Sequence, residues 1–395
     1  MMRRLILLHL ERPSIHRAIP ALQHLLSPPN ASSRDLLTSR ALPNARLIKA
    51  FALTNTFVSC EVDIHTAFVG RAMFLLKSVT ERGWVHFQNI AVDSVEEALS
   101  HADEKDFDIF VQDVTMRVAL VAILGIDVSV GELDSEDIHI VSMLITLLWS
   151  LSKQPDPIPA DLLPRLNRHL RRLIPDEIAY PNPLDFVIPV WETMWRVIAT
   201  SVAYAQNFSY IFSELHCSPT MDQFRHFDGT HPSVEWFITE VMRLHPPSKR
   251  IARASLIHPF PAFLPLSFDK LTAKLFGSLL RRECADIGSV LQSRCIWGAD
   301  ADVFEPFRFH SNRLTRDQEM IKSLPFGCGR YKCVAANWAP MAAGIISAAI
   351  LDRVQSGSDF RLVTGKSIGD REGWSGWSVV AEAAKSLSSR NSEST

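Results

Sequence analysis

The stretch from Leu324 to Ala335, LPFGCGRYKCVA, constrains this chain more than any other. It places Cys333 between a loop that contains Gly327 and Gly329 and an apolar run, Val334 to Leu351, which predicts a helix. Glycines accept φ > 0 and let a backbone turn close beneath a ligand. A cysteine at a helix start lies near the positive end of the helix dipole, which favours the thiolate. The stretch therefore predicts a thiolate that can bind a soft metal ion.

Two further segments supply charged side chains. In TEVMRLHPP, Glu240 and Arg243 are three residues apart, so they share one helix face and can pair. Such a pair is common, and on a surface it contributes at most about 1 kcal/mol. The segment FEPFRF, Phe304 to Phe309, adds Arg308.

Taken in order, the three segments resemble the cytochrome P450 family. They match F-G-x-G-x-x-x-C-x-A, E-x-x-R-L-x-P-P and F-x-P-x-R-F. The resemblance implies that Cys333 is the axial thiolate of haem b and that the loop of Phe326, Gly327 and Gly329 lies beneath it. It also implies that Arg308 joins Glu240 and Arg243 to hold this loop. A buried trio of this kind must be fully paired, because an uncompensated charge costs about 3–5 kcal/mol.

A fourth segment, VIPVWETMW, is similar to the central helix of the family. Glu192 and Thr193 fall where the family carries an acid and an alcohol, which implies that they relay protons to dioxygen. The segment departs from the family, because Pro189 and Val190 replace a small Ala-Gly pair. The alternative for Thr193 is a hydrogen bond back to a carbonyl of its own helix.

The resemblance further implies basic residues that hold the haem propionates. The family often has one of them two residues before the cysteine, where this chain has Tyr331. The candidates elsewhere are His65 or Arg71 in DIHTAFVGRAM, Arg253 or Arg250 in PPSKRIAR, and Arg330.

Helical periodicity dominates the chain from about residue 46 onward, and the segment from Pro181 to Ala205 predicts a buried central helix. Strands are expected only in short pieces, and residues 248–290 are ambiguous. We therefore predict one mainly α domain over residues 46–395, preceded by a variable extension over residues 1–45. The resemblance implies the cytochrome P450 fold, with haem between the central helix and the Cys333 loop.

The chain has 395 residues and a net charge of −2, so its composition does not indicate a nucleic-acid partner. It has no apolar stretch of the roughly 18 residues that a membrane span needs, and Leu5 to Leu10 is too short for an anchor. The endoplasmic reticulum membrane face or the cytoplasm is the expected location. The arginine-rich, acid-poor stretch from Met1 to Arg40 is also typical of a mitochondrial presequence, or of a variable extension.

The function that the resemblance implies is a monooxygenase that inserts one atom of O2 into an apolar organic substrate. Electrons would come from a separate NADPH-dependent reductase, because no G-x-G-x-x-G segment is present. A fungal type of the family, acting in secondary metabolism, is the expected setting. Two alternatives stay open: a redox-neutral rearrangement or dehydration, and a truncated, non-catalytic remnant, because the family has more residues before its central helix.

Overall fold

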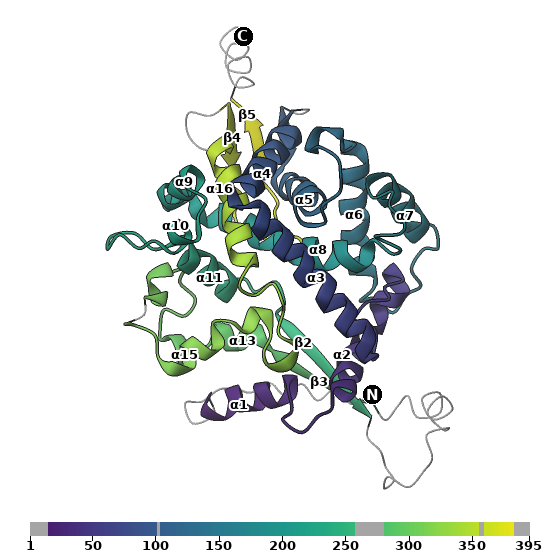
Figure 1. The fold of residues 1–395 in the computed structure, drawn as a ribbon. Coiled ribbons are helices and arrows are strands. Elements are labelled where there is room, and N and C mark those ends of the chain that lie inside the picture. Colours follow the sequence, from purple (N-terminus) through teal and green to yellow (C-terminus); the bar gives the residue numbers. More distant parts are fainter. Residues whose placement is uncertain (1–14, 101–102, 257–279, 311, 355–358, 383–395) are drawn as a thin grey trace, which may run out of the picture.

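A computed structural model describes residues 15–100, 103–256, 280–310, 312–354 and 359–382. Helices dominate the described chain, and five short strands accompany them, which confirms the predicted mainly α class (Figure 1). The helices are α1 (Ile15–Leu26), α2 (Ser33–Phe51), α3 (Val62–Arg82), α4 (Trp84–Leu99), α5 (Phe107–Val118), α6 (Ser135–Leu151), α7 (Leu162–Leu173), α8 (Leu184–Tyr204), α9 (Ser209–Cys217), α10 (Met221–Arg225), α11 (Val234–Leu244), α13 (Ile287–Leu291), α14 (Arg294–Trp297), α15 (Arg316–Ile321) and α16 (Ala339–Val354).

The strands form two separate antiparallel sheets. The first has the order β1-β5-β4, so β1 (Glu104–Asp106) pairs with β5 (Ser378–Ala381), which also pairs with β4 (Phe360–Val363). The second pairs β2 (Arg250–Leu256) with β3 (Leu280–Asp286), in a register that sets Arg250 opposite Asp286. The ambiguous region of the sequence therefore contributes a strand pair.

The central helix, α8, lies in the main hydrophobic core, as its apolar sequence predicts. Trp191 and Trp195 are fully buried in it, and α8 packs against α5, α11 and α16. A smaller second core joins the N-terminal helix α1 to the segment that precedes the cysteine loop. Its members include Leu22, Leu291, Trp297 and Leu324. The loop thus lies on this second core.

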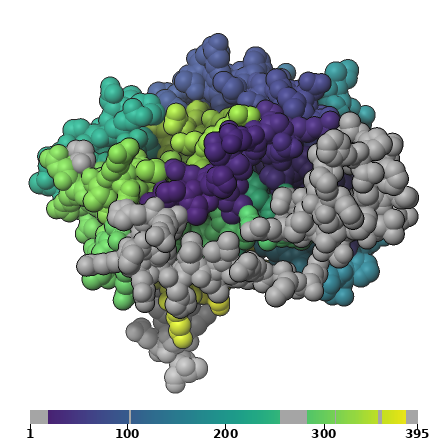
Figure 2. All heavy atoms as spheres, turned by 90° about the horizontal axis from the view of Figure 1, so that it is seen from below, coloured from purple at the N-terminus to yellow at the C-terminus, as the bar shows by residue number. Residues whose placement is uncertain are grey.

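The N-terminal helices are part of the folded body. Ser32 and Asp35 form a capping box at the start of α2, which then runs unbroken to Phe51 across the division expected at residue 45. Figure 2 shows the N-terminal residues, in purple, lying against the light-green residues of the last third of the chain. The predicted extension therefore contains helices that pack beside the cysteine loop.

The helix after Cys333 begins later than the apolar run predicts. Turns occupy residues 334–338, and α16 begins only at Ala339. Pro340 is consequently its second residue, in the first turn, where a missing N–H breaks no intrahelical hydrogen bond and no kink follows.

In the described part of the chain, no helix has both the length and the apolar composition that a membrane crossing requires. The short apolar stretch from Leu5 to Leu10 lies outside the described residues.

Candidate functional site

Glu240 and Arg243 form a buried, two-pronged ion pair on α11. The Nε of Arg243 donates to Oε2 of Glu240 at 2.6 Å, and a terminal nitrogen donates to Oε1 at 2.8 Å. Their side chains are 0% and 1% exposed. Ser233 accepts from the Trp236 amide and fixes the start of this helix. Glu240 and Arg243 therefore form the ion pair that their spacing predicts. The pair lies in the interior of the protein and not on its surface.

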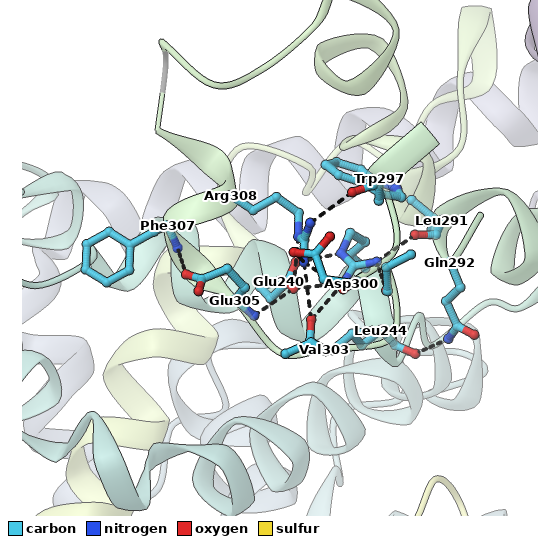
Figure 3. Close-up of polar contacts among 12 residues, drawn as sticks. Glu240, Leu244, Leu291, Gln292, Trp297, Asp300, Val303, Glu305, Phe307 and Arg308 are labelled. Atoms are coloured by element: carbon cyan, nitrogen blue, oxygen red, sulfur yellow. Dashed lines mark hydrogen bonds and ion pairs between the residues drawn. The ribbon is translucent and has the colours of Figure 1, made fainter. Parts of the chain in front are cut away.

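Arg308 approaches the same carboxylate from the segment that follows. Its Nε lies 3.5 Å from Oε1 of Glu240, and its terminal nitrogens donate to the carbonyls of Trp297 and Asp300. The guanidinium of Arg243 donates to the carbonyls of Leu291 and Ala301. These contacts, drawn in Figure 3, join α11 to residues 291–308. The structure therefore brings the predicted trio together, as a clamp on the chain leading to the cysteine loop.

The cysteine loop is closed by one backbone hydrogen bond, from the Cys333 amide to the Phe326 carbonyl at 2.9 Å. Gly327 and Gly329 have φ of 75° and 71°, in the left-handed region where glycine is favoured. A Cβ on Gly329 would also lie 2.2 Å from the Cβ of Ser27, just after α1. Both glycines are thus required by the turn, and Gly329 by a close neighbour as well.

Cys333 is an exposed residue, although protein atoms surround its sulfur closely enough for burial to raise the pKa of the thiol. The amide of Ala335 and the charge of Lys332 act in the opposite direction, but more weakly. The thiolate that the helix-start argument predicts is therefore not favoured in the free protein. The physical reason is that α16 begins at Ala339, too far along the chain to present its N-terminus to the sulfur.

His65, on α3, lies beside the cysteine loop. Its imidazole meets the ring of Tyr331 edge on, with the centroids 4.5 Å apart, and its Nδ1 lies 2.7 Å from the Thr56 hydroxyl. Burial, and then the charge of Arg40, lower the pKa of His65. The alternative candidate, Arg71, lies over the rings of Phe74 and Tyr180 instead.

Arg253 and Arg40 add two guanidinium groups to this region. Burial lowers the pKa of Arg253, whose charge acts on the thiol of Cys328. Burial, followed by the charge of Arg253, lowers the pKa of Arg40 to about 10. Neither arginine forms an ion pair within the described residues, and the buried Nε of Arg40 makes no hydrogen bond there. Three basic side chains thus gather near the loop, and none of them pairs with a carboxylate of the described residues.

The other predicted basic residue, Arg330, points elsewhere. It is exposed, and its guanidinium donates to the Ser33 hydroxyl at 3.2 Å. Its amide also donates weakly to the Ser27 hydroxyl at 3.5 Å. These contacts connect the loop to the start of α2 and do not place Arg330 with the other cations.

On α8, Glu192 and Thr193 differ in environment. Glu192 is 3% exposed and pairs with Arg196, at 3.0 Å, and with Arg371. Thr193 is only partly buried and makes no hydrogen bond through its hydroxyl to another described residue, including the carbonyls of its own helix. Phe186, Pro189 and Val190 are likewise only partly buried, and the helical spacing places all three on one face with Thr193. We call these four residues the open face of α8.

One face of α3 connects the open face of α8 with the cysteine loop. Phe68 stacks on Phe186 with centroids 5.4 Å apart, and His65, three residues earlier, contacts Tyr331. Residues three apart on a helix are neighbours, with about 5–6 Å between their Cβ atoms. The loop and the open face are therefore walls of the same region.

The comparisons with known proteins bear on this arrangement. No family model matches the chain, and no curated protein matches it by sequence. Among solved structures, a six-coordinated cytochrome P450 from Thermus thermophilus aligns with a TM-score of 0.56 at 14% identity, over 91% of this chain and 90% of that one. P450BioI, in complex with an acyl carrier protein ligated to hexadec-9Z-enoic acid, aligns with a TM-score of 0.52 at 14% identity, over 92% and 91%.

The chain has the cytochrome P450 fold. The prediction made from three short segments is thereby confirmed at the level of architecture. Proteins of this fold bind haem, so its fit to the residues present can be tested.

The residues of this chain fit a haem. Cys333 offers a soft sulfur on an exposed residue, and it would hold the iron as the thiolate. Arg40, His65 and Arg253 bring positive or hydrogen-bonding groups that lack carboxylate partners in the described chain, which suits the two propionates. The buried Nε of Arg40 has no hydrogen-bond partner among the described residues, whereas buried polar atoms normally have one.

Sequence reasoning missed Arg40, because it lies in the part assigned to the extension. The available signal was Tyr331, which stands where P450 sequences often have a basic residue. In the structure, the guanidinium carbon of Arg40 lies over the Tyr331 ring, 5.1 Å from its centroid. A cation from α2 thus lies beside Tyr331, the position at which the loop has no basic residue.

Proposed function

We propose that this chain is a haem-thiolate monooxygenase that inserts one oxygen atom of O2 into an apolar organic substrate. Haem b would lie between the open face of α8 and the Cys333 loop. The observation that carries the proposal is the single face of α3 that contacts both, through Phe68 on Phe186 and His65 on Tyr331. When bound, the haem would supply the iron chemistry that activates dioxygen.

Cys333 would be the axial ligand, with its loop held from below by the clamp of Glu240, Arg243 and Arg308. Arg40, His65 and Arg253 would bind the propionates. Charge-assisted hydrogen bonds between guanidinium and carboxylate groups are short and strong, so they fix the orientation of a bound group. Such bonds would also pair the uncompensated charge of Arg40 and Arg253.

Thr193 would hold a proton-carrying hydroxyl at the open face of α8, where a substrate and dioxygen would meet. Glu192, the preceding residue of the helix, would supply protons to this hydroxyl. Its present pairing with Arg196 and Arg371 requires one of these arginines to move before Glu192 can exchange a proton. The apolar side chains of Phe186, Pro189 and Val190 suit an apolar substrate body. Electrons would come from a separate NADPH-dependent reductase.

The proposal is tested by the absorption spectrum of the purified chain, reduced and exposed to CO. We expect the strongly red-shifted Soret band of thiolate-ligated iron in the wild type and in Cys328→Ser. The same band should be absent from Cys333→Ser. Cys328 is a matched control, because it lies in the same loop but packs on the second core. A wild-type protein without bound porphyrin would contradict the proposal and favour a non-catalytic remnant.

A second candidate is a haem-thiolate enzyme that catalyses a redox-neutral rearrangement or dehydration. The pairing of Glu192 with two arginines favours it, because a fixed carboxylate is a poor proton relay. Product formation without NADPH and O2 would support this candidate over the monooxygenase.

A further inference from the structure

Cationic side chains from several distant segments gather on the side of α8 next to its open face. We call Arg46, Lys153, Arg196 and Arg371 the cationic cluster. Arg46 comes from α2, Arg196 from α8, Lys153 from the connection after α6, and Arg371 from the chain between β4 and β5. The two guanidinium groups of Arg46 and Arg371 lie over one indole, that of Trp149, at 4.9 and 5.1 Å from its centroid.

The carboxylates at the cluster are already engaged. Glu192 pairs with Arg196 and Arg371, whereas Asp370 pairs with Arg196 and with Lys249. A third, Glu372, lies near Arg371 and accepts a hydrogen bond from Ser150. Five cationic side chains, with Lys249 included, therefore face three carboxylates in the described chain.

Arg46 and Lys153 hold the excess positive charge. Arg46 donates to the Ser152 hydroxyl, and neither residue forms an ion pair with a described carboxylate. Burial lowers the pKa of Lys153 to about 8, and the charges of Arg371, Arg46 and Arg196 add to this effect. Like charges held together in partly desolvated surroundings are costly, and an anion would relieve that cost.

The cluster borders the open face. Successive residues of an α-helix are about 100° apart, so Glu192 and Arg196 point roughly a quarter turn away from Thr193 and Phe186. Pro189 lies between the two directions. A ligand whose apolar body lies on the open face can therefore reach the cluster with one end.

We infer that the cationic cluster binds the carboxylate of an apolar organic acid, whose hydrocarbon part lies along the open face of α8. The inference rests on the proposed function, because it makes this acid the substrate class. Guanidinium groups suit this carboxylate, since their paired N–H donors match its two oxygen atoms. The substrate would be held at both ends, by charge at one and by apolar contact at the other.

The test is isothermal titration calorimetry of the purified full-length chain with dodecanoate, and with dodecan-1-ol as the uncharged probe. We expect dodecanoate to bind about tenfold more weakly to Lys153→Gln and to Arg46→Gln than to the wild type. Arg165→Gln is the matched control, because Arg165 is an exposed arginine of α7 outside the cluster, and it should bind as the wild type does. Binding of dodecan-1-ol should not change in any variant.

Three outcomes would overturn the inference. They are no binding of dodecanoate to the wild type, equal binding to Lys153→Gln, and displacement of dodecanoate by inorganic phosphate at equal concentration. Lys153 is an exposed residue whose ammonium group is only partly desolvated, so its variant should fold even if Arg46→Gln does not. The heat of binding needs no turnover. A chain that shows the thiolate band but does not discriminate between the two probes overturns this inference alone. A chain without the band that still discriminates overturns the proposed function, and the acid is then a ligand of the cluster and not a substrate.

Discussion

The guanidinium carbon of Arg40 lies 5.1 Å from the centre of the Tyr331 ring, so α2 contacts the cysteine loop two residues before the sulfur. The same Tyr331 ring meets His65 edge on. Arg40 therefore couples to His65 through space, and its charge is one cause of the lowered pKa of that imidazole.

Replacing Arg40 with glutamine should raise the pKa of His65, because a neighbouring positive charge disfavours the imidazolium. NMR titration of the imidazole in wild type and Arg40→Gln measures this directly. Arg330→Gln is the control, since Arg330 points to Ser33 instead. An unchanged His65 pKa in Arg40→Gln would contradict the coupling.

His65 should also make the free energy of unfolding depend on pH. Its pKa in the folded chain is below its ordinary value, so the unfolded state binds more protons as the pH falls through that range. The contribution of His65 to the free energy of unfolding is thus fully present above the ordinary histidine pKa. It is lost as the pH falls from that value through the lowered pKa of the folded chain. Urea titrations from pH 7.5 to about pH 5 should show a shallower loss in His65→Gln than in the wild type. Equal slopes would show that another group is responsible.

Replacing Arg243 with alanine should lower the free energy of unfolding by about 3–5 kcal/mol, because Glu240 would remain buried without its main partner. The variant should also fail to retain haem. Arg294→Ala is the control, since Arg294 forms an exposed ion pair with Asp302 that contributes no more than about 1 kcal/mol. Denaturant unfolding and the haem content after purification measure both effects. Normal haem content in Arg243→Ala would refute the role of the clamp.

Alanine at Gly329 should destabilise the chain more than alanine at Gly327. Both glycines have positive φ, which costs an L-residue about 1–2 kcal/mol. Only Gly329 would also bring its Cβ against Ser27. Adding Ser27→Gly should therefore recover part of the loss in Gly329→Ala and nothing in Gly327→Ala. A thermal unfolding double-mutant cycle reports this, and equal losses at the two glycines would argue against the contact.

If the chain is a monooxygenase, Thr193→Ala should reduce coupled product formation by about 10²-fold or more. This factor is the lower end of the rate enhancement that a proton-transfer group typically contributes. The reason is the position of its hydroxyl on the open face of α8. Thr193→Ser keeps a hydroxyl there and should retain most of the activity. The ratio of product to NADPH consumed is the measurement. Full coupling in Thr193→Ala would leave Thr193 without this role.

Some of the site could be predicted from sequence because the relationships are local. Glu240 and Arg243 pair because three residues make almost one helical turn, and the loop glycines mark a turn whatever surrounds it. Thr193 could be placed on the central helix for the same reason. The start of α16 was predicted too early, because an apolar run alone does not show where a helix begins.

The sequence by itself determined the mainly helical class and the cysteine loop, because spacing within a few residues encodes both, and its resemblance to the cytochrome P450 family implied the fold. Only the tertiary structure decided which charges meet. Arg40 reaches the loop from the other end of the chain, Glu192 is buried against Arg371, and the Cys333 thiol has a raised pKa. Burial and long-range charge cause all three, and both depend on chain segments whose contact no local pattern records.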